Sequence, residues 1–228
     1  MKKDNLVTLL SLTLTLLIVA VIPCTYALNG FLPYGTAILK RGGYMDALIV
    51  VGSRCASSDL EVASLLASEL NRQGGYVEVR RDVEVSLDEL KSHNVVVIGG
   101  PAVNRLFDEL WGYLSVWFFK EKGSYYALVG ALRFDNPDIG VIDIEKSPFN
   151  TGKVIVVLAG NTRVGTKAAV EAFLSVKFKR GNVAIVSFEG EQIRVHGYLM
   201  GLCNQQKAVV FKKRPGVVKV VVDRVLPE

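Results

Sequence analysis

The order of predicted strands and helices indicates an α/β fold with a mainly parallel sheet of the Rossmann-like or flavodoxin-like kind, flanked by helices. Three strand–turn–helix units of similar build lie at about 46–74, 94–114 and 153–176. Alternation of this kind gives parallel strands joined by right-handed crossovers. After residue 180 the chain is rich in β-branched residues, which predicts a β-rich C-terminal extension of the same domain.

The first unit opens with an apolar run at 46–51, which is too short for a buried helix and is bounded by turn residues. Ser58 and Glu61 have the spacing of a capping box, so a helix is expected to begin there and to end at Gly74. A second strand is expected at 76–80.

The second unit combines a short helix capped by Ser86, a strand at 94–98 and a helix that starts at Pro101 and continues to about residue 114. The third unit has an apolar strand at about 153–158 and a helix at about 165–176. Further strands are expected at 125–133, 139–145, 182–188, 192–199, 208–212 and 217–225.

The N-terminus has the order of an export signal. Lys2 and Lys3 precede an uncharged run at 6–22, and a Thr-x-Ala site ends at Ala27. Residues 1–27 are therefore predicted to be a cleaved signal peptide or an uncleaved membrane anchor, because 17 residues lie near the lower limit for spanning a bilayer. Both alternatives place the rest of the chain outside the cytoplasm, at the cell surface or secreted.

The composition of the chain fits a folded domain that follows residues 1–27. The chain has 228 residues, of which 50% are hydrophobic and 21% charged, and this excludes a disordered or multi-span membrane protein. We expect an α/β domain at 28–180 and its β-rich extension at 181–228. Basic clusters at 177–180 and 212–214 are expected to be solvated or to contact anionic lipid or an acidic wall polymer in an exported chain, so no nucleic-acid partner is expected.

No motif for catalysis is present. There is no GxGxxG, no P-loop, no zinc spacing and no serine elbow, and His93 and His196 have no nucleophile at a suggestive spacing. We therefore expect no enzyme activity, no cofactor and no metal. The loops after the parallel strands could bind a ligand or could simply form turns and caps. Their candidate residues are Ser53, Arg54, Asn104, Asn161, Arg163 and Thr166.

Two further groups of residues leave alternatives open. Cys55 and Cys203 could form a disulfide in an exported protein or could remain buried thiols. The aromatic residues around 111–126 could cover one edge of the core or could contact another subunit, because Trp and Tyr are frequent anchors of interfaces. The interface candidates are Trp111, Trp117, Phe118 and Phe119.

Three segments resemble a known family. Residues 50–59, 95–104 and 147–169 carry an apolar strand, a Gly-containing loop and the start of a helix, in the order found in the archaeal S-layer proteins of the methanococcal and thermococcal type. The resemblance implies a structural, assembly or accessory role at the archaeal cell envelope, with other S-layer subunits or copies of itself as partners. If residues 6–22 are not cleaved off, they could contact the membrane. The chain is shorter than such subunits generally are, so a stand-alone short version is expected. An extracytoplasmic ligand-binding module is the alternative.

Overall fold

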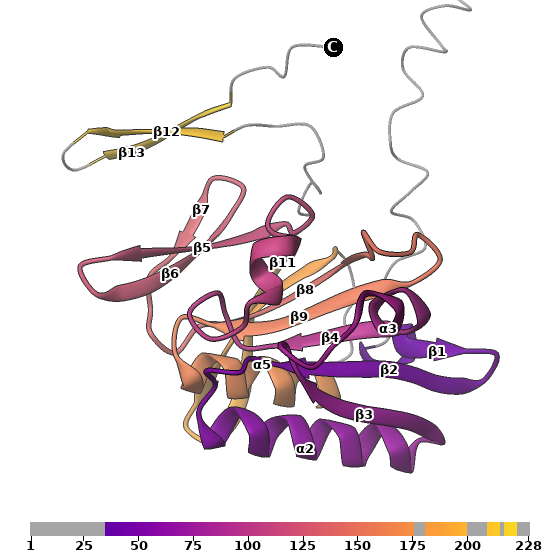
Figure 1. Cartoon of the computed structure of the whole chain (residues 1–228). Coiled ribbons are helices and arrows are strands. Elements are labelled where there is room, and N and C mark those ends of the chain that lie inside the picture. The colour runs from indigo at the N-terminus through magenta and orange to yellow at the C-terminus, as the bar shows by residue number, and fades with distance from the viewer. Residues whose placement is uncertain (1–34, 176–180, 200–208, 215–216, 223–228) are drawn as a thin grey trace, which may run out of the picture. The chain divides into compact units, whose positions relative to one another are not determined.

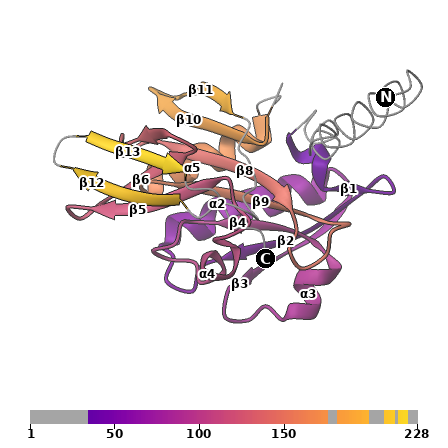
Figure 2. The ribbon, with the colours of Figure 1, turned by 90° about the horizontal axis from the view of Figure 1, so that it is seen from above.

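The computed structural model describes residues 35–175, 181–199, 209–214 and 217–222 (Figure 1). Its largest sheet has eight strands in the order β1-β2-β4-β9-β8-β10-β11, and β3 also pairs with β2. Figure 2 shows β3 on one side of this sheet and β11 on the other. The strands are β1 (Lys40–Arg41), β2 (Tyr44–Val51), β3 (Gly75–Arg81), β4 (Asn94–Ile98), β8 (Gly140–Lys146), β9 (Val154–Gly160), β10 (Val183–Glu189) and β11 (Gln192–Leu199).

The sheet is mixed, so the prediction of a mainly parallel Rossmann-like or flavodoxin-like fold is wrong. β3, β2, β4 and β9 are parallel neighbours, but β8 is antiparallel to both β9 and β10, and β11 is antiparallel to β10. The reason is visible in the connections. A parallel pair needs a crossover of a dozen or more residues, whereas a short loop without a helix joins β8 to β9.

Helices cover one face of the sheet and a second, smaller sheet lies over the other (Figure 1). α2 (Ser57–Arg72) and α5 (Arg163–Ser175) pack against each other and against the strands. The other face carries α3 (Leu87–Ser92), α4 (Leu106–Leu110) and the antiparallel strands β5 (Val116–Glu121), β6 (Ser124–Val129) and β7 (Leu132–Phe134). A 3-10 helix, η2 (Gly35–Leu39), precedes β1. A separate antiparallel pair is formed by β12 (Val209–Arg214) and β13 (Val217–Val222).

Both faces of the central strands are buried, because each face has its own cover. Val50 of β2, Val97 of β4 and Val157 of β9 belong to one core cluster with Phe107 of α4 and Phe118 of β5. The alternate residues of the same strands point to the opposite face, towards α2 and α5. Burial on both faces explains why these strands read as continuous apolar runs in the sequence.

Of the four predicted helix starts, the one at Ser86 agrees with the structure, the one at about 165 falls two residues after the start of α5 at Arg163, and the other two differ in their caps or position. α2 begins at Ser57, where the Asp59 carboxylate accepts a hydrogen bond from the Ala56 N–H at 3.3 Å, so the predicted Ser58–Glu61 capping box is wrong. The Ser86 capping box is confirmed, because Ser86 Oγ accepts from the Glu89 N–H at 3.3 Å and Glu89 accepts from the Ser86 N–H at 2.8 Å.

The predicted helix from Pro101 to about residue 114 is also wrong, since α4 covers Leu106–Leu110 alone. Asn104 explains the difference. Its Nδ2 donates to the carbonyl oxygens of Val50 and Ile98, both at 3.1 Å, and its Oδ1 accepts from the Leu106 N–H at 3.1 Å. This side chain is therefore hydrogen-bonded to β2, to β4 and to the backbone of Leu106. These bonds hold the segment after β4 in a turn.

The predicted export segment at 1–27 lies outside the described residues. Within the described residues, no helix is long and apolar enough to cross a bilayer.

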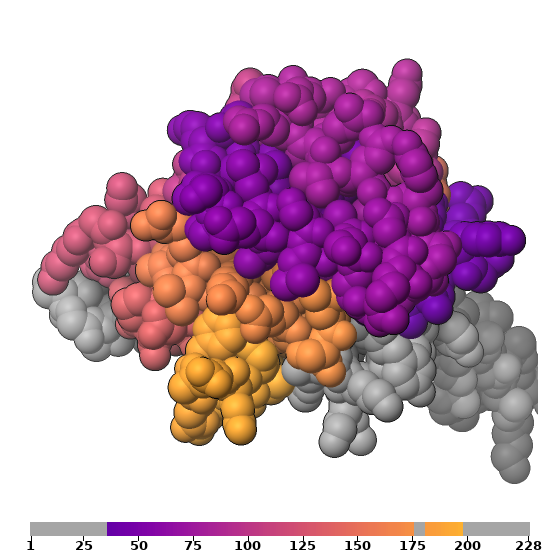
Figure 3. Space-filling model, turned by 90° about the horizontal axis from the view of Figure 1, so that it is seen from below, coloured from indigo at the N-terminus to yellow at the C-terminus, as the bar shows by residue number. Residues whose placement is uncertain are grey.

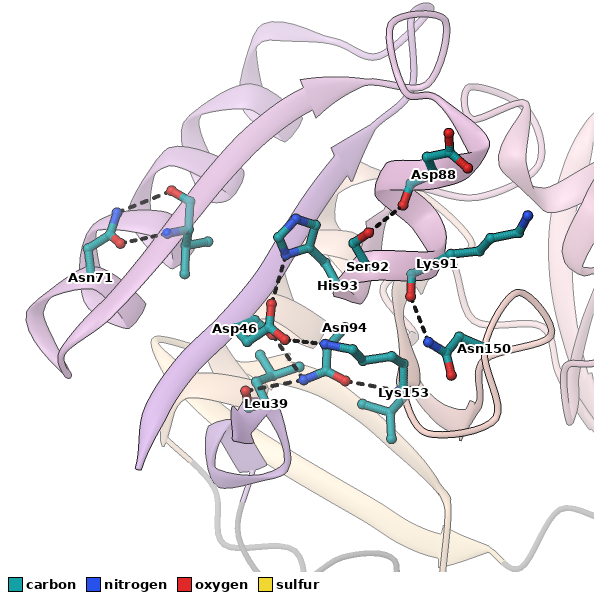
Figure 4. Close-up of polar contacts among 12 residues, drawn as sticks. Leu39, Asp46, Asn71, Asp88, Lys91, Ser92, His93, Asn94, Asn150 and Lys153 are labelled. Atoms are coloured by element: carbon teal, nitrogen blue, oxygen red, sulfur yellow. Dashed lines mark hydrogen bonds and ion pairs between the residues drawn. The ribbon is translucent and has the colours of Figure 1, made fainter. Parts of the chain in front are cut away.

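The outer edge of β3 is largely closed by the chain itself. Asn71 of α2 donates to the Val77 carbonyl oxygen at 3.3 Å and accepts from the Val77 N–H at 2.8 Å, as a neighbouring strand would (Figure 4). At the end of β3 the Glu84 N–H donates to the Arg81 carbonyl oxygen at 2.9 Å. Edge strands with free backbone groups are templates for aggregation, so these contacts protect the sheet.

We expect Asn71→Leu to increase self-association and to lower stability by about 1 kcal/mol, because the Val77 N–H and C=O lose their partners. Sedimentation velocity over a concentration series and urea unfolding would measure both effects. Ser68→Ala, at an exposed position of α2, is the control. An Asn71→Leu variant with the mass and unfolding midpoint of that control would contradict this account of the edge.

Candidate functional site

A small pocket lies where β4 and β9 end. Its volume is about 150 Å³. The carboxyl ends of parallel strands are where an α/β sheet commonly binds ligands, and here the pocket also meets the beginnings of α2 and α5. It is lined by Asp59, Gly99, Gly100, Pro101, Ala102, Val103, Phe118, Tyr125, Gly160, Asn161, Thr162, Arg163 and Thr166.

The pocket brings together three of the six predicted ligand residues, and two of these serve the loops themselves. Asn161 is 6% exposed, and its Nδ2 donates to the Phe134 and Asn136 carbonyl oxygens at 2.8 and 2.9 Å. Thr166 Oγ1 donates to the Thr162 carbonyl oxygen at 3.3 Å. Arg163 is exposed at the first position of α5.

The other three predicted residues do not line the pocket. Asn104 is 1% exposed and holds the turn described above. The Ser53 N–H donates to Asp82 at 2.8 Å, and the Arg54 N–H donates to the Val103 carbonyl oxygen at 3.4 Å. Asp82 also accepts from the Arg105 N–H at 2.6 Å, so this carboxylate ties together two loops at the same end of the sheet.

Asp59 is the acidic group of the pocket, and it is 4% exposed. Burial raises the pKa of its carboxyl, while the Ala56 N–H and the charge of Arg163 oppose that rise. The nearby Cys55 thiol is partly exposed, and burial together with the charge of Asp59 raises its pKa, which makes it a weak nucleophile. Cys203 lies outside the described residues, so its disulfide with Cys55 stays a prediction. Among the described residues, no group of three or more His, Cys, Asp or Glu side chains could hold a metal ion.

A second polar cluster lies at the opposite ends of the parallel strands (Figure 4). Asp46 of β2 pairs with the buried Lys153 and accepts a hydrogen bond from His93 Nδ1 at 2.8 Å. Burial raises the pKa of the Asp46 carboxyl, but the contacts with Lys153 and His93 outweigh burial and lower it. Beside it, Asn94 donates to the Leu39 and Asp46 carbonyl oxygens at 3.2 and 2.9 Å. The cluster fixes where β2, β4 and β9 begin.

A third cluster contains two buried acids of β8. Asp143 accepts from the N–H groups of Ser115 and Val116 at 2.8 and 3.0 Å, just before and at the start of β5. Glu145 accepts from Ser115 Oγ at 2.5 Å and from Asn182 at 2.6 Å. Burial raises the pKa of both carboxyls, and for Glu145 the negative charge of Asp143 raises it further. The pair therefore retains a proton and ties the small sheet to the large one.

An aromatic face covers the outer side of β5 and β6. Trp111 lies 5.5 Å from Trp117 and 5.9 Å from Phe119, measured between ring centroids. Phe119 stacks on Tyr126 at 5.8 Å, and the guanidinium of Arg133 lies 3.7 Å from the centre of the Tyr126 ring. We call these five residues the aromatic face.

Of the four predicted interface residues, Trp111, Trp117 and Phe119 belong to this face. Trp111 is 37% exposed. Phe118 points the opposite way, because side chains alternate along a strand, and at 3% exposure it belongs to the core.

Several residues of these clusters are not among the sequence candidates: Asp46, Asp82, Asn94, Asp143, Glu145, Lys153 and Asn182. A signal for the acids of β8 is present in the sequence. Asp143 and Glu145 alternate with Ile142 and Ile144 inside a predicted strand, and a charge inside such a strand needs a partner when it is buried.

Together these observations define a mixed α/β domain in which buried Asn, Asp and Glu side chains hold strands and loops in place. The model of the S-layer like family, outer domain, matches residues 76–176. This confirms the resemblance to S-layer proteins, and the second and third resembling segments, 95–104 and 147–169, lie inside the match. That family points to a structural role at the cell surface.

Part of the chain is also similar to a curated protein. An uncharacterized protein of Methanocaldococcus jannaschii is 29% identical over 102 residues, which cover 45% of this chain and 20% of that protein. The chain therefore matches about a fifth of that longer protein.

Proposed function

We propose that the chain is an exported cell-envelope protein whose S-layer-like domain has a structural, assembly or accessory role at the archaeal cell surface. The match of residues 76–176 to the S-layer-like outer domain carries this proposal. The use of polar side chains supports it. Asn94, Asn104 and Asp143 each bind two or more backbone groups, so their hydrogen-bonding capacity serves the architecture. We also propose that the chain has no catalytic activity.

Self-association or assembly with other envelope subunits follows from the same proposal, and the aromatic face is the surface that suits it. Tryptophan and tyrosine carry much of the binding energy at protein interfaces. Among the aromatic rings of this face, Trp111 is the most exposed, at 37%. Arg133 and its partners Glu121 and Asp135 add a polar rim beside the rings.

We expect Trp111→Ala to weaken association by roughly 30-fold, which corresponds to a hot-spot loss of about 2 kcal/mol. Sedimentation equilibrium and co-sedimentation with isolated envelopes would measure the loss. Leu65→Ala removes a side chain that is 50% exposed on α2, and it serves as the control. A parent protein that stays monomeric and ignores envelopes would overturn the proposed function.

A ligand-binding module is the second candidate, and the pocket at Asp59 and Arg163 favours it. A small sugar, amino acid or anion that binds the folded state would raise the melting temperature. A screen of such ligands that leaves the melting temperature unchanged would remove this candidate.

A further inference from the structure

Two tyrosines and two cations gather at one end of the large sheet. Tyr44 and Tyr76 are 73% and 77% exposed, the highest fractions among the large hydrophobic side chains of the described residues. Lys40 and Arg41 are also exposed. We call these four residues the tyrosine patch.

Strand register explains why Arg41, Tyr44 and Tyr76 are neighbours on one face, whereas Lys40 is opposite the buried Met45 and lies on the other face of the hairpin. β1 and β2 form a hairpin in which Arg41 is opposite Tyr44, across a turn of Gly42 and Gly43 with φ of 58° and 91°. Tyr76 of β3 is opposite Asp46, so it lies diagonally from Tyr44 on the same face of the sheet. In Figure 3 the indigo β1–β2 turn stands out from the surface at the right.

The patch carries a positive charge because the acids next to it are already paired. Asp46 is bound by Lys153 and His93, and Glu78 is bound by Arg80 and by the Tyr76 hydroxyl. Within the described residues, Lys40 and Arg41 form no ion pair. Exposed tyrosine next to unpaired cations is the side-chain chemistry of a membrane interface, where the ring enters the headgroup region and the cation meets anionic lipid.

The path of the chain points to the same end of the sheet. The uncharged run in the sequence ends at residue 22, and the described structure begins at residue 35, five residues before β1. Thirteen residues reach at most about 45 Å when fully extended, and a flexible chain of that length spans roughly 20 Å on average. A chain anchored through residues 6–22 would therefore keep the domain within reach of the bilayer, and η2 and β1 are the described elements that follow this connection most closely along the chain.

We propose that the tyrosine patch faces the membrane and contacts anionic lipid headgroups in a chain that keeps residues 6–22 as its anchor. The inference rests on the proposed function, since it requires a chain at the envelope, and it adds which surface of the domain meets the lipid.

The test uses the full chain in phosphatidylcholine vesicles that contain phosphatidylglycerol and a brominated lipid, which quenches nearby tryptophan. Flotation first reports whether the chain is anchored. Tyr44→Trp then adds a tryptophan to the patch, and Leu65→Trp adds one to the exposed side of α2 as the matched control. We expect the brominated lipid to quench the tryptophan at 44 more strongly than it quenches the two native tryptophans. The tryptophan at 65 should stay unquenched.

Charge supplies a second arm. In the Tyr44→Trp background, Arg41→Ser should lower the ratio of patch-bound to unbound molecules by roughly five-fold, and Lys40→Ser, on the other face of the hairpin, should lower it less. A chain that floats but shows no excess quenching at 44 overturns the patch while leaving the envelope role intact. A chain that does not float overturns the anchor and the patch together. A third outcome is that the fluorescence of the tryptophan at 44 shifts to shorter wavelength as the amount of protein per vesicle rises, without quenching by bromine. That outcome would assign the patch to contact with a second copy of the chain and would overturn the lipid contact.

Discussion

Gly165→Ala is expected to destabilise the fold by roughly 3–5 kcal/mol. This loss is a large fraction of the free energy of unfolding of an ordinary domain. A Cβ at Gly165 would lie 2.0 Å from the carbonyl oxygen of Ile139 and 2.6 Å from its carbonyl carbon. These are backbone atoms of the segment that enters β8, so they cannot move aside as the end of a side chain can. The first turn of α5 would have to separate from the sheet.

The neighbouring glycines have the same role. A Cβ at Gly140 would lie 2.2 Å from the Gly165 carbonyl oxygen, and one at Gly160 would lie 2.4 Å from the Gly165 carbonyl carbon. Helix and sheet backbones therefore touch directly at this point. Urea unfolding followed by circular dichroism measures the cost, with Gly112→Ala as the control because a Cβ there meets nothing within 4 Å. Equal unfolding midpoints for the two variants would show that the contact is looser than described.

Glu145→Gln is expected to stabilise the fold at alkaline pH and to flatten its dependence on pH. The folded chain holds the pKa of Glu145 at about 9, because the group is buried and lies beside Asp143. In the unfolded chain a glutamate has a pKa of about 4.3. Between these values the folded state binds the proton more tightly, so the stability contributed by this group is full in acid and is lost as the pH rises.

The slope for one retained proton is at most about 1.4 kcal/mol per pH unit. Glutamine keeps the shape of the side chain and its Oε1 can still accept from Ser115 and Asn182, but it carries no charge to bury. We therefore expect the variant to gain roughly 1–3 kcal/mol over the parent at about pH 8 and to lose most of the difference at about pH 5.

Urea midpoints from about pH 5 to pH 9 would measure how the two curves diverge as the pH rises. Glu61→Gln, on the exposed side of α2, is the matched control and should run parallel to the parent. A Glu145→Gln curve that also runs parallel to the parent would contradict the assignment of a retained proton to the buried pair.

Periodicity located the strands of this fold better than it oriented them. The runs at 46–51, 94–98 and 153–158 correspond to β2, β4 and β9, because strands buried on both faces are apolar throughout. The antiparallel direction of β8 depends on the connection to β9, and the absence of a helix in that loop was the available signal. β5 was missed because its large aromatic residues followed directly on a segment expected to be helical.

The candidate site was predicted in outline and not in detail. Loop composition located the strand ends at Asn161 and Arg163 correctly, since Gly and Asn mark turns. It could not show that Asn104 and Asn161 are buried and that their Nδ2 groups already donate to backbone carbonyl oxygens. That depends on Val50 and Phe134, which are distant along the chain and meet these side chains only in the folded sheet.

The place of β2 in the sheet has a consequence for how such a domain can be exchanged between proteins. β2 lies between β3 and β4, yet it precedes the segment that matches the S-layer-like outer domain, which begins at residue 76. A gene fragment cut at the limits of that match would encode β3 and β4 without the strand that joins them. Recombination or protein engineering that moves this domain intact has to carry the preceding forty or so residues, from η2 onward, as part of the same unit.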